Sequence, residues 1–178
     1  MTVQLRPWSP SDAPALLAAR RSSPDLSRQF GGIEFADGTQ AAAHIQTHLR
    51  FDESAVNWAV VEDGVAVGNV GLSAIERRHG TAWAHYWLAQ PVRGRGLAAG
   101  ALQSAATWAF DDGLFRLELG HRLDNPASCR VAVAAGFVAE GIERQKLRYG
   151  DVRHDVETHA RLATDPVGQA VALPVNGS

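Results

Sequence analysis

The sequence predicts a single α+β domain, built on a mixed, mostly antiparallel sheet flanked by helices. Its 178 residues, 46% of them hydrophobic, are enough for one buried core and too few for two ordinary domains. Strand-like segments joined by hairpin signals occupy the first half, and a strand–helix–strand unit in the second half requires one parallel pair. We expect residues 1–163 to form the domain and 164–178 to form a loose C-terminal tail, since the last stretch is rich in Pro and Gly without periodicity.

The first half of the chain carries clear start and turn signals. Ser11-Asp12 is typical of a helix start, and Asp37 or Thr39 can cap a second helix. Asp63-Gly64 is among the strongest short hairpin signals, so the strands around it should form an antiparallel meander with the next one. In chain order we expect a strand at 3–8, helices at 13–21 and 40–51, and strands at 58–62, 66–72 and 82–88.

The second half changes pattern at Gln90-Pro91, after which apolar residues recur at helical spacing. Asn125-Pro126 places a good cap and a good first residue at the start of a short helix, and Gly136 is suited to end it. In chain order we expect a helix at 97–110, a strand at 114–123, the short helix from Asn125 to Gly136, and strands at 144–149 and 155–162.

Composition argues against several classes of function. The formal net charge is -2 with interspersed signs, so no global field favours nucleic acid. No apolar run is long enough to suggest a membrane segment or a secretion signal. The single cysteine, Cys129, cannot form an intramolecular disulfide and fits a cytoplasmic protein. We expect no metal: no Cys/His spacing resembles a zinc site, and the pair His44 and His48 has no further ligand nearby and should be solvated.

The segment Arg93-Gly94-Arg95-Gly96-Leu97-Ala98, between a strand and a helix, predicts an anion cradle. Glycines let the backbone approach a ligand, and a helix start presents unpaired N–H groups that suit a pyrophosphate. Two alternatives compete: a dinucleotide fingerprint through Gly94, Gly96 and Ala99, which lacks its parallel-sheet context, and a basic loop that simply turns the chain. Nucleic-acid binding through the Arg-Gly repeat is a third alternative, and the net charge disfavours it.

Several motifs in order resemble the GNAT superfamily of N-acetyltransferases. Arg93, Gly96 and Ala98 match its Q/R-x-x-G-x-G/A segment. Asn125 and Ser128 match the N-x-x-S motif about thirty residues on, followed by matching G-F and E-G pairs at 136–137 and 140–141. The tripeptide at 86–88, Tyr-Trp-Leu, is similar to the end of the fourth strand in the branch that acetylates ribosomal-protein N-termini at alanine or serine.

The resemblance implies that the strands ending at Leu88 and near Leu123 splay apart, with the pantetheine arm of acetyl-CoA between them and no metal involved. A neutral amine would then attack the thioester directly. The residues it implies for binding the cofactor are Leu88, Arg93, Gly94, Arg95, Gly96, Leu97, Ala98, Asn125 and Ser128.

Three residues are candidates for catalysis. Ser128, in the first turn of its helix, is our candidate for protonating the departing thiolate, although an ordinary first-turn serine is the alternative. The carboxylates that relatives use as base are not matched, since Trp83 and Leu147 stand near those positions. His85 is a substitute of the right chemistry, with a histidine packed between aromatics as the alternative. Tyr149 lies in the segment that closes over the acceptor in the family.

The acceptor is the least determined part of the prediction. The resemblance favours the α-amine of a protein or peptide N-terminus, with the loop 22–35, the second helix and the hairpin at 149–154 around it. Acetylation of a small amine, such as a polyamine, aminoglycoside or amino acid, is one alternative. A domain that binds acyl-CoA without catalysis is another alternative. Members of the family often dimerise, so the resemblance also allows a homodimer.

Overall fold

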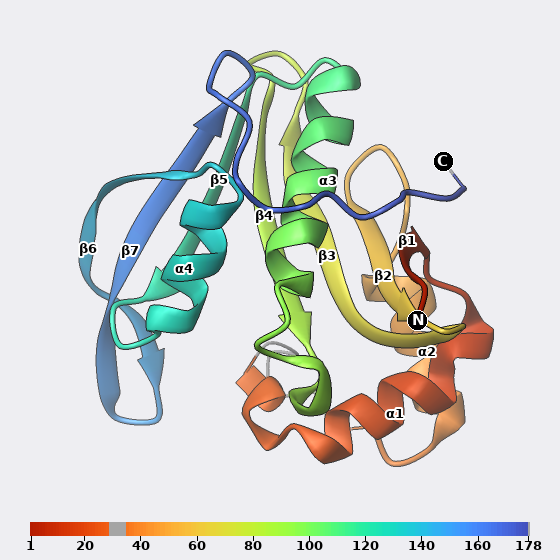
Figure 1. The fold of residues 1–178 in the computed structure, drawn as a ribbon. Helices are drawn as coiled ribbons and strands as arrows, with labels where there is room; N and C mark the ends of the chain where they lie inside the picture. Colours follow the sequence, from red (N-terminus) through yellow and green to blue (C-terminus); the bar gives the residue numbers. More distant parts are fainter. Residues whose placement is uncertain (29–34, 178) are drawn as a thin grey trace.

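A computed structural model of the chain describes residues 1–28 and 35–177 and contains one mixed seven-stranded sheet of order β1-β2-β3-β4-β5-β7-β6 (Figure 1). Among the described strands β4 and β5 are the parallel pair, and the other neighbours run antiparallel. The α+β prediction is therefore confirmed. The strands are β1 (Val3–Pro7), β2 (Val56–Glu62), β3 (Val65–Glu76), β4 (Thr81–Leu88), β5 (Arg116–Arg122), β6 (Val138–Tyr149) and β7 (Val152–Leu162).

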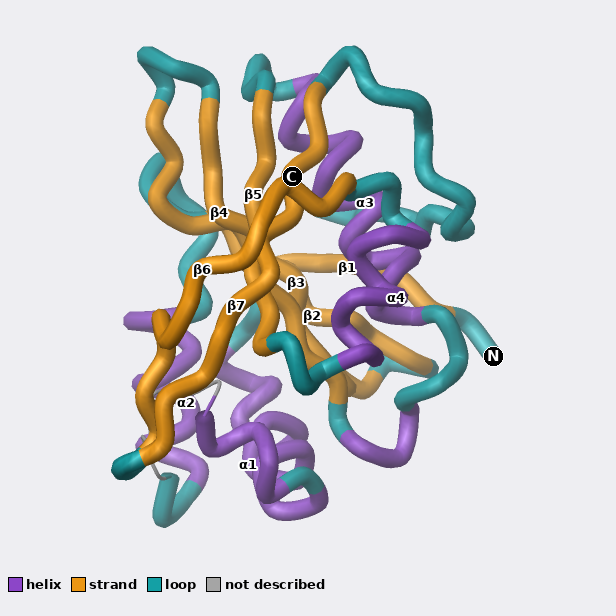
Figure 2. The backbone as a smooth tube through the Cα atoms, turned by 90° about the vertical axis from the view of Figure 1, so that its left-hand side faces the viewer, coloured by secondary structure: helices purple, strands orange, loops and turns teal. Residues whose placement is uncertain are grey.

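Four α-helices accompany the described part of the sheet. They are α1 (Ala13–Ser22), α2 (Gly38–His48), α3 (Leu97–Asp111) and α4 (Pro126–Ala134). The helices α3 and α4 lie side by side against the sheet, and α1 packs on α2 at the end where α3 begins (Figures 1 and 2). No helix in the described ranges is long and apolar enough to cross a membrane.

The core lies between α3 and the central strands. Ala101, Leu102 and Ala106 of α3 are completely buried, and Trp58 of β2 meets Trp108 edge-on at 5.0 Å between ring centroids. Because neighbouring residues of a strand point to opposite faces, Asn57 must point away from α3. The same alternation of side chains between the two faces decides which residues of β4 face α3 and α4.

The predicted elements all exist, and their bounds differ where the hydrophobic pattern is uninformative. The strand predicted at 144–149 begins at Val138, because β6 is an edge strand with nearly every residue exposed and shows no alternation. The second helix ends at His48, before the predicted residue 51. His44 was expected in solvent, yet it is buried and stacks on His48 at 4.5 Å between ring centroids, and burial lowers its pKa to about 4.

The C-terminal segment is not loose, and this part of the sequence prediction is wrong. It runs from the end of α4 across α3 to β1 (Figure 1). The Ala170 N–H donates to Ala134 O, and Ser104 Oγ of α3 bonds both the N–H and the carbonyl of Leu173. At its end, Leu5 N–H of β1 donates to Pro174 O, and Asn176 N–H donates to Leu5 O. Backbone and side-chain hydrogen bonds hold this segment, and such bonds leave no periodic pattern of apolar residues.

Gly100 of α3 gives a test of this packing. A Cβ on Gly100 would lie 2.5 Å from Val171 O, so no side chain fits beneath the C-terminal segment. In an ordinary helix Gly→Ala stabilises by about 1 kcal/mol. We predict that Gly100→Ala instead lowers the free energy of unfolding by about 1 kcal/mol or more in the full chain, measured by urea denaturation.

The matched control is the same substitution in a chain that ends at residue 168. Without the segment the clash is gone, and Gly100→Ala should be neutral or stabilising there. An equal effect in both chains would contradict the packing described above.

Candidate functional site

The parallel strands β4 and β5 separate after three residue pairs. Thr81, Ala82 and Trp83 pair with residues 116–118, and beyond that point the two strands diverge toward the starts of α3 and α4 (Figure 1). β5 stays paired with β7 as far as Arg122, and β4 stays paired with β3 as far as Leu88. The edge of β4 from Ala84 to Leu88 therefore has no strand partner on the β5 side among the described strands.

A cavity of about 410 Å³ opens at this divergence. The end of β4, the start of α3 and residues of α4 as far as Ala134 line it, together with Asp25 and Leu26 from the segment after α1. The structure brings together eight of the residues predicted for the site: Leu88, Arg93, Gly94, Gly96, Leu97, Ala98, Asn125 and Ser128.

The start of α3 has the properties of an anion cradle. Gly94 and Gly96 have positive φ values of 76° and 79°, a conformation that favours glycine. Gly96 is the N-cap of α3 and has no side chain to accept from the first amides of the helix, so these N–H groups are left for a ligand. A Cβ at either glycine would meet no protein atom within 4 Å, which leaves space for a phosphate directly against the backbone.

The two arginines of this segment differ in where they point. Arg93 Nε donates to Leu88 O at 2.8 Å, and its guanidinium pairs with Asp25 at 2.9 Å on the rim of the cavity. Arg95 was also predicted to bind the anion, but it is absent from the cavity lining, because its guanidinium forms an ion pair with Glu62 at the end of β2. Of these two arginines only Arg93 lines the cavity, where Arg130 of α4 is a second lining arginine.

Asn125 and Ser128 form a closed hydrogen-bonded unit at the start of α4. Asn125 Oδ1 accepts from the Ser128 N–H at 3.2 Å and thereby caps the helix. Asn125 Nδ2 donates to Ser128 Oγ at 3.0 Å. The serine oxygen is thus an acceptor here, and within the described part of the chain its own proton has no acceptor. The hydroxyl of Ser128 can therefore donate this proton into the cavity.

Tyr86 also lines the cavity, and the sequence analysis did not single it out as a site residue. Its hydroxyl donates to the Ser128 carbonyl oxygen at 3.1 Å and so ties α4 to β4. Burial raises the pKa of Tyr86 to about 12, which keeps the phenol protonated. The signal that could have found it is the two-residue period of β4, which puts Tyr86 on the same face as Leu88.

His85 lies outside the cavity, contrary to its predicted place beside the reacting groups. As the neighbour of Tyr86 in β4 it points to the opposite face of the sheet. There its Nε2 lies 3.1 Å from Asn57 Oδ1, which also accepts from Asn69, and Trp8 in turn donates to Asn69 at 2.8 Å. Burial lowers the pKa of His85, so the ring is held neutral within this network.

Tyr149 is likewise outside the cavity, at the tip of the β6–β7 hairpin. Its ring contacts His154 at 5.4 Å between centroids, and the Arg122 guanidinium lies 5.7 Å from the centre of the phenol ring. Beside it a second hollow of about 480 Å³ is lined by Leu123, Asp124, Gln145, Asp151, Arg153, His154 and Asp155. Three of these residues are aspartates. The part of the predicted acceptor loop at 29–34 lies outside the described residues.

Comparisons with known proteins agree with this geometry. Residues 2–138 match the family described as "Acetyltransferase (GNAT) domain". The chain is 29% identical over 174 residues to the probable N-acetyltransferase YjcK of Bacillus subtilis, covering 92% of this chain and 96% of that protein. It is 32% identical over 104 residues to the ribosomal-protein-serine acetyltransferase of Escherichia coli, a match that spans 58% of each protein.

A solved structure extends the similarity to the whole fold. A ribosomal L7/L12 α-N-protein acetyltransferase in complex with coenzyme A superposes with a TM-score of 0.81 at 25% identity, covering 91% of this chain and 94% of that one.

The two bonds of Asn125 can be separated by substitution. We predict that Asn125→Ala lowers the free energy of unfolding by about 1 kcal/mol, because α4 loses its cap. Asn125→Asp keeps the accepting oxygen and should retain most of that stability, yet it cannot donate to Ser128 Oγ. Thermal unfolding of the two variants checks the cap. Equal destabilisation by both would contradict a capping role for the Asn125 oxygen.

Proposed function

We propose, from the premise that the chain belongs to the acetyltransferase (GNAT) domain family of acetyl-CoA-dependent enzymes, that it acetylates the α-amine of a protein or peptide N-terminus. The observation that carries the proposal is the cavity at the β4–β5 divergence, which joins an anion cradle to a polarised serine. A cytoplasmic setting, which the single cysteine favours, belongs to the same proposal.

The residues of the cavity fit acetyl-CoA. The open backbone at Gly94 and Gly96 and the first amides of α3 would hold the pyrophosphate. The unpaired edge of β4 offers backbone groups to the amide-containing pantetheine arm. Arg93 can add charge once its ion pair with Asp25 opens, because an exposed pair of this kind contributes less than about 1 kcal/mol. When bound, acetyl-CoA supplies the activated acetyl group and leaves as a thiol.

Proton transfer is assigned to Ser128 on the side of the leaving group. Its Oγ accepts from Asn125, which orients the hydroxyl, and its proton remains available for a departing thiolate. The first turn of α4 also favours negative charge near this position. A backbone N–H at the unpaired end of β4, near Leu88, is our candidate for meeting the developing oxyanion.

No side chain in the cavity is well suited to act as base. Asp25 is its one lining carboxylate among the described residues, and Arg93 engages it as an ion pair. His85 lies on the other face of the sheet and donates to Asn57. We therefore propose that the ammonium proton leaves to solvent through the open end of the cavity, with no dedicated base.

The α-amine is favoured as acceptor by the names of two relatives, one a ribosomal-protein-serine acetyltransferase and one an α-N-protein acetyltransferase. A second candidate is a small cationic amine such as a polyamine or aminoglycoside. The hollow beside Tyr149 favours it, because Asp124, Asp151 and Asp155 in its lining would attract ammonium groups.

We predict that Ser128→Ala lowers kcat for acetyl transfer about a hundredfold, the usual scale of general-acid catalysis, while Ser128→Thr keeps most of the rate. Both variants should still bind acetyl-CoA. The check on binding is the thermal midpoint, which a saturating ligand raises by a few degrees in a chain of this size. An alanine variant as fast as the parent would remove Ser128 from the reaction.

The acceptor is tested with a panel of amines at one acetyl-CoA concentration. We expect transfer to peptides that begin with serine or alanine, and none to the same peptides with a blocked N-terminus and a free lysine. Turnover of polyamines or aminoglycosides alone would favour the second candidate. A thermal shift with acetyl-CoA and no turnover of any amine would indicate a binding domain without catalysis.

A further inference from the structure

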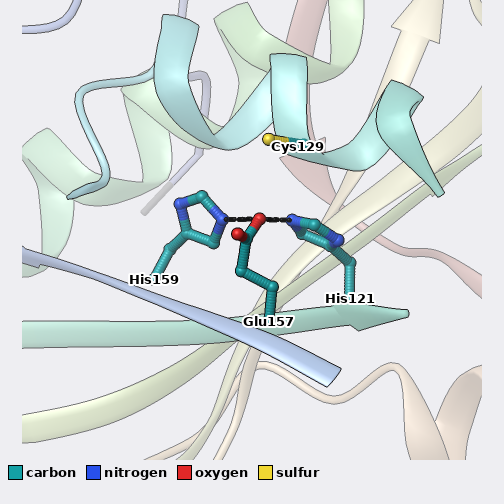
Figure 3. A group of neighbouring side chains, drawn as sticks. All are labelled: His121, Cys129, Glu157 and His159. Carbon is teal, nitrogen blue, oxygen red and sulfur yellow. Dashed lines mark hydrogen bonds and ion pairs between the residues drawn. The ribbon is translucent and has the colours of Figure 1, made fainter. Parts of the chain in front are cut away.

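Four potential metal ligands converge beneath α4, away from the cavity. They are His121 of β5, Cys129 of α4, and Glu157 and His159 of β7 (Figure 3). Their ligand atoms all lie within 4.8 Å of one another. None of the four residues lines the cavity at the β4–β5 divergence.

The strand register explains why three of them meet. His121 pairs directly with Glu157 across the antiparallel β5–β7 ladder, and His159 follows two residues later on the same face. That face is turned toward α4, from which Cys129 reaches the same point (Figure 3). Both histidines are almost fully buried, with 7% and 2% of their surface exposed, so solvent does not account for their polar atoms.

The hydrogen bonds fix which atom of His121 faces the cluster. Its Nδ1 lies 3.0 Å from the carbonyl oxygen of Arg122, which can only accept, so Nδ1 donates this bond and Nε2 is the ring atom that faces the cluster. The Nε2 atom lies 3.3 Å from the Glu157 carboxylate and 3.1 Å from His159 Nε2. Glu157 Oε2 lies 3.0 Å from His159 Nε2. Three atoms that can each offer a lone pair thus lie within 3.3 Å of one another, an arrangement that one bound cation can satisfy.

We propose that His121, Cys129, Glu157 and His159 form a binding site for one zinc-type divalent transition-metal ion. Imidazole, thiolate and carboxylate are the ligands that zinc takes in proteins. The separations of 3.0, 3.1 and 3.3 Å are close to the edge of a tetrahedron with metal–nitrogen bonds of about 2.0–2.1 Å, which is about 3.3 Å. The Nδ1–H bond from His121 to a backbone carbonyl is the arrangement that orients a ligating histidine.

The donor set indicates a structural ion. Four protein ligands fill a tetrahedral zinc ion and leave no position for a substrate. The ion would join α4 to β5 and β7, and Cys129 directly follows Ser128, so metal binding would fix the helix turn that carries the serine. A metal ion can reach the four ligands from the side of Glu157, because the side chain of this residue is 24% exposed. The sequence analysis missed this site because its ligands come from three elements with no short spacing between the histidines and the cysteine.

The experiment uses the full chain, freed of metal by a chelator under reducing conditions and titrated with Zn²⁺ or Co²⁺. We expect one ion per chain and a rise of several degrees in thermal midpoint on adding Zn²⁺. Bound Co²⁺ should give visible bands of tetrahedral intensity and a near-ultraviolet charge-transfer band from the Cys129 thiolate. In Cys129→Ser that charge-transfer band should vanish, and affinity should fall at least about tenfold.

Two sets of variants keep the proposal falsifiable. His159→Gln and Glu157→Gln should also weaken binding, and Cys129→Ser serves as the test if either of these two variants fails to fold. His79→Gln changes an exposed histidine in the β3–β4 turn and should bind like the parent. Absence of stoichiometric binding overturns the proposal and leaves the cluster as a proton-sharing network. Binding that survives Cys129→Ser unchanged and disappears in His48→Gln also overturns it.

Discussion

The site depends on one constraint, the early end of pairing between the only parallel strands in the described sheet. β4 and β5 share just three pairs, and each is held on its other side by an antiparallel neighbour. Because a buried backbone edge must find partners, the free edge of β4 is costly unless a ligand or solvent satisfies it. The same divergence brings the starts of α3 and α4 to one opening. The candidate binding surface, the proposed anion cradle and the position of Ser128 all follow from that separation.

Side-chain contacts keep the two diverging halves in register. Tyr86 reaches from β4 to the backbone of α4. The C-terminal segment connects α4 to α3 and then to β1, which is the edge strand at the opposite end of the sheet from β6. The opening therefore has a defined width although no strand pairing crosses it. The buried chain of Trp8, Asn69, Asn57 and His85 acts on the other face, where it links four neighbouring segments by hydrogen bonds.

Much of the fold could be predicted from the sequence, and so could most of the residues that line the candidate cradle. Hairpin signals, glycines and the Asn-Pro helix start are local features of the sequence, and the correct predictions of strands, turns and helices rest on them. What failed were features set by tertiary contact. Arg95 is drawn to Glu62, a partner 33 positions away in sequence, and the place of His85 depends on which face of β4 meets the helices. The cluster under α4 arises from strand register, which no spacing along the chain reveals.

The hydrogen bonds between residues 174–176 and β1 also set an order in which the edge of the sheet becomes covered. β1 is an edge strand, and Pro174 to Asn176 cover the outward polar groups of Leu5. An uncovered edge is a template for pairing with another chain. During synthesis β1 emerges before residues 174–176, because these residues lie about 170 positions later in the chain. Each nascent molecule therefore passes through a stage in which nearly the whole fold can form while one sheet edge stays open to association.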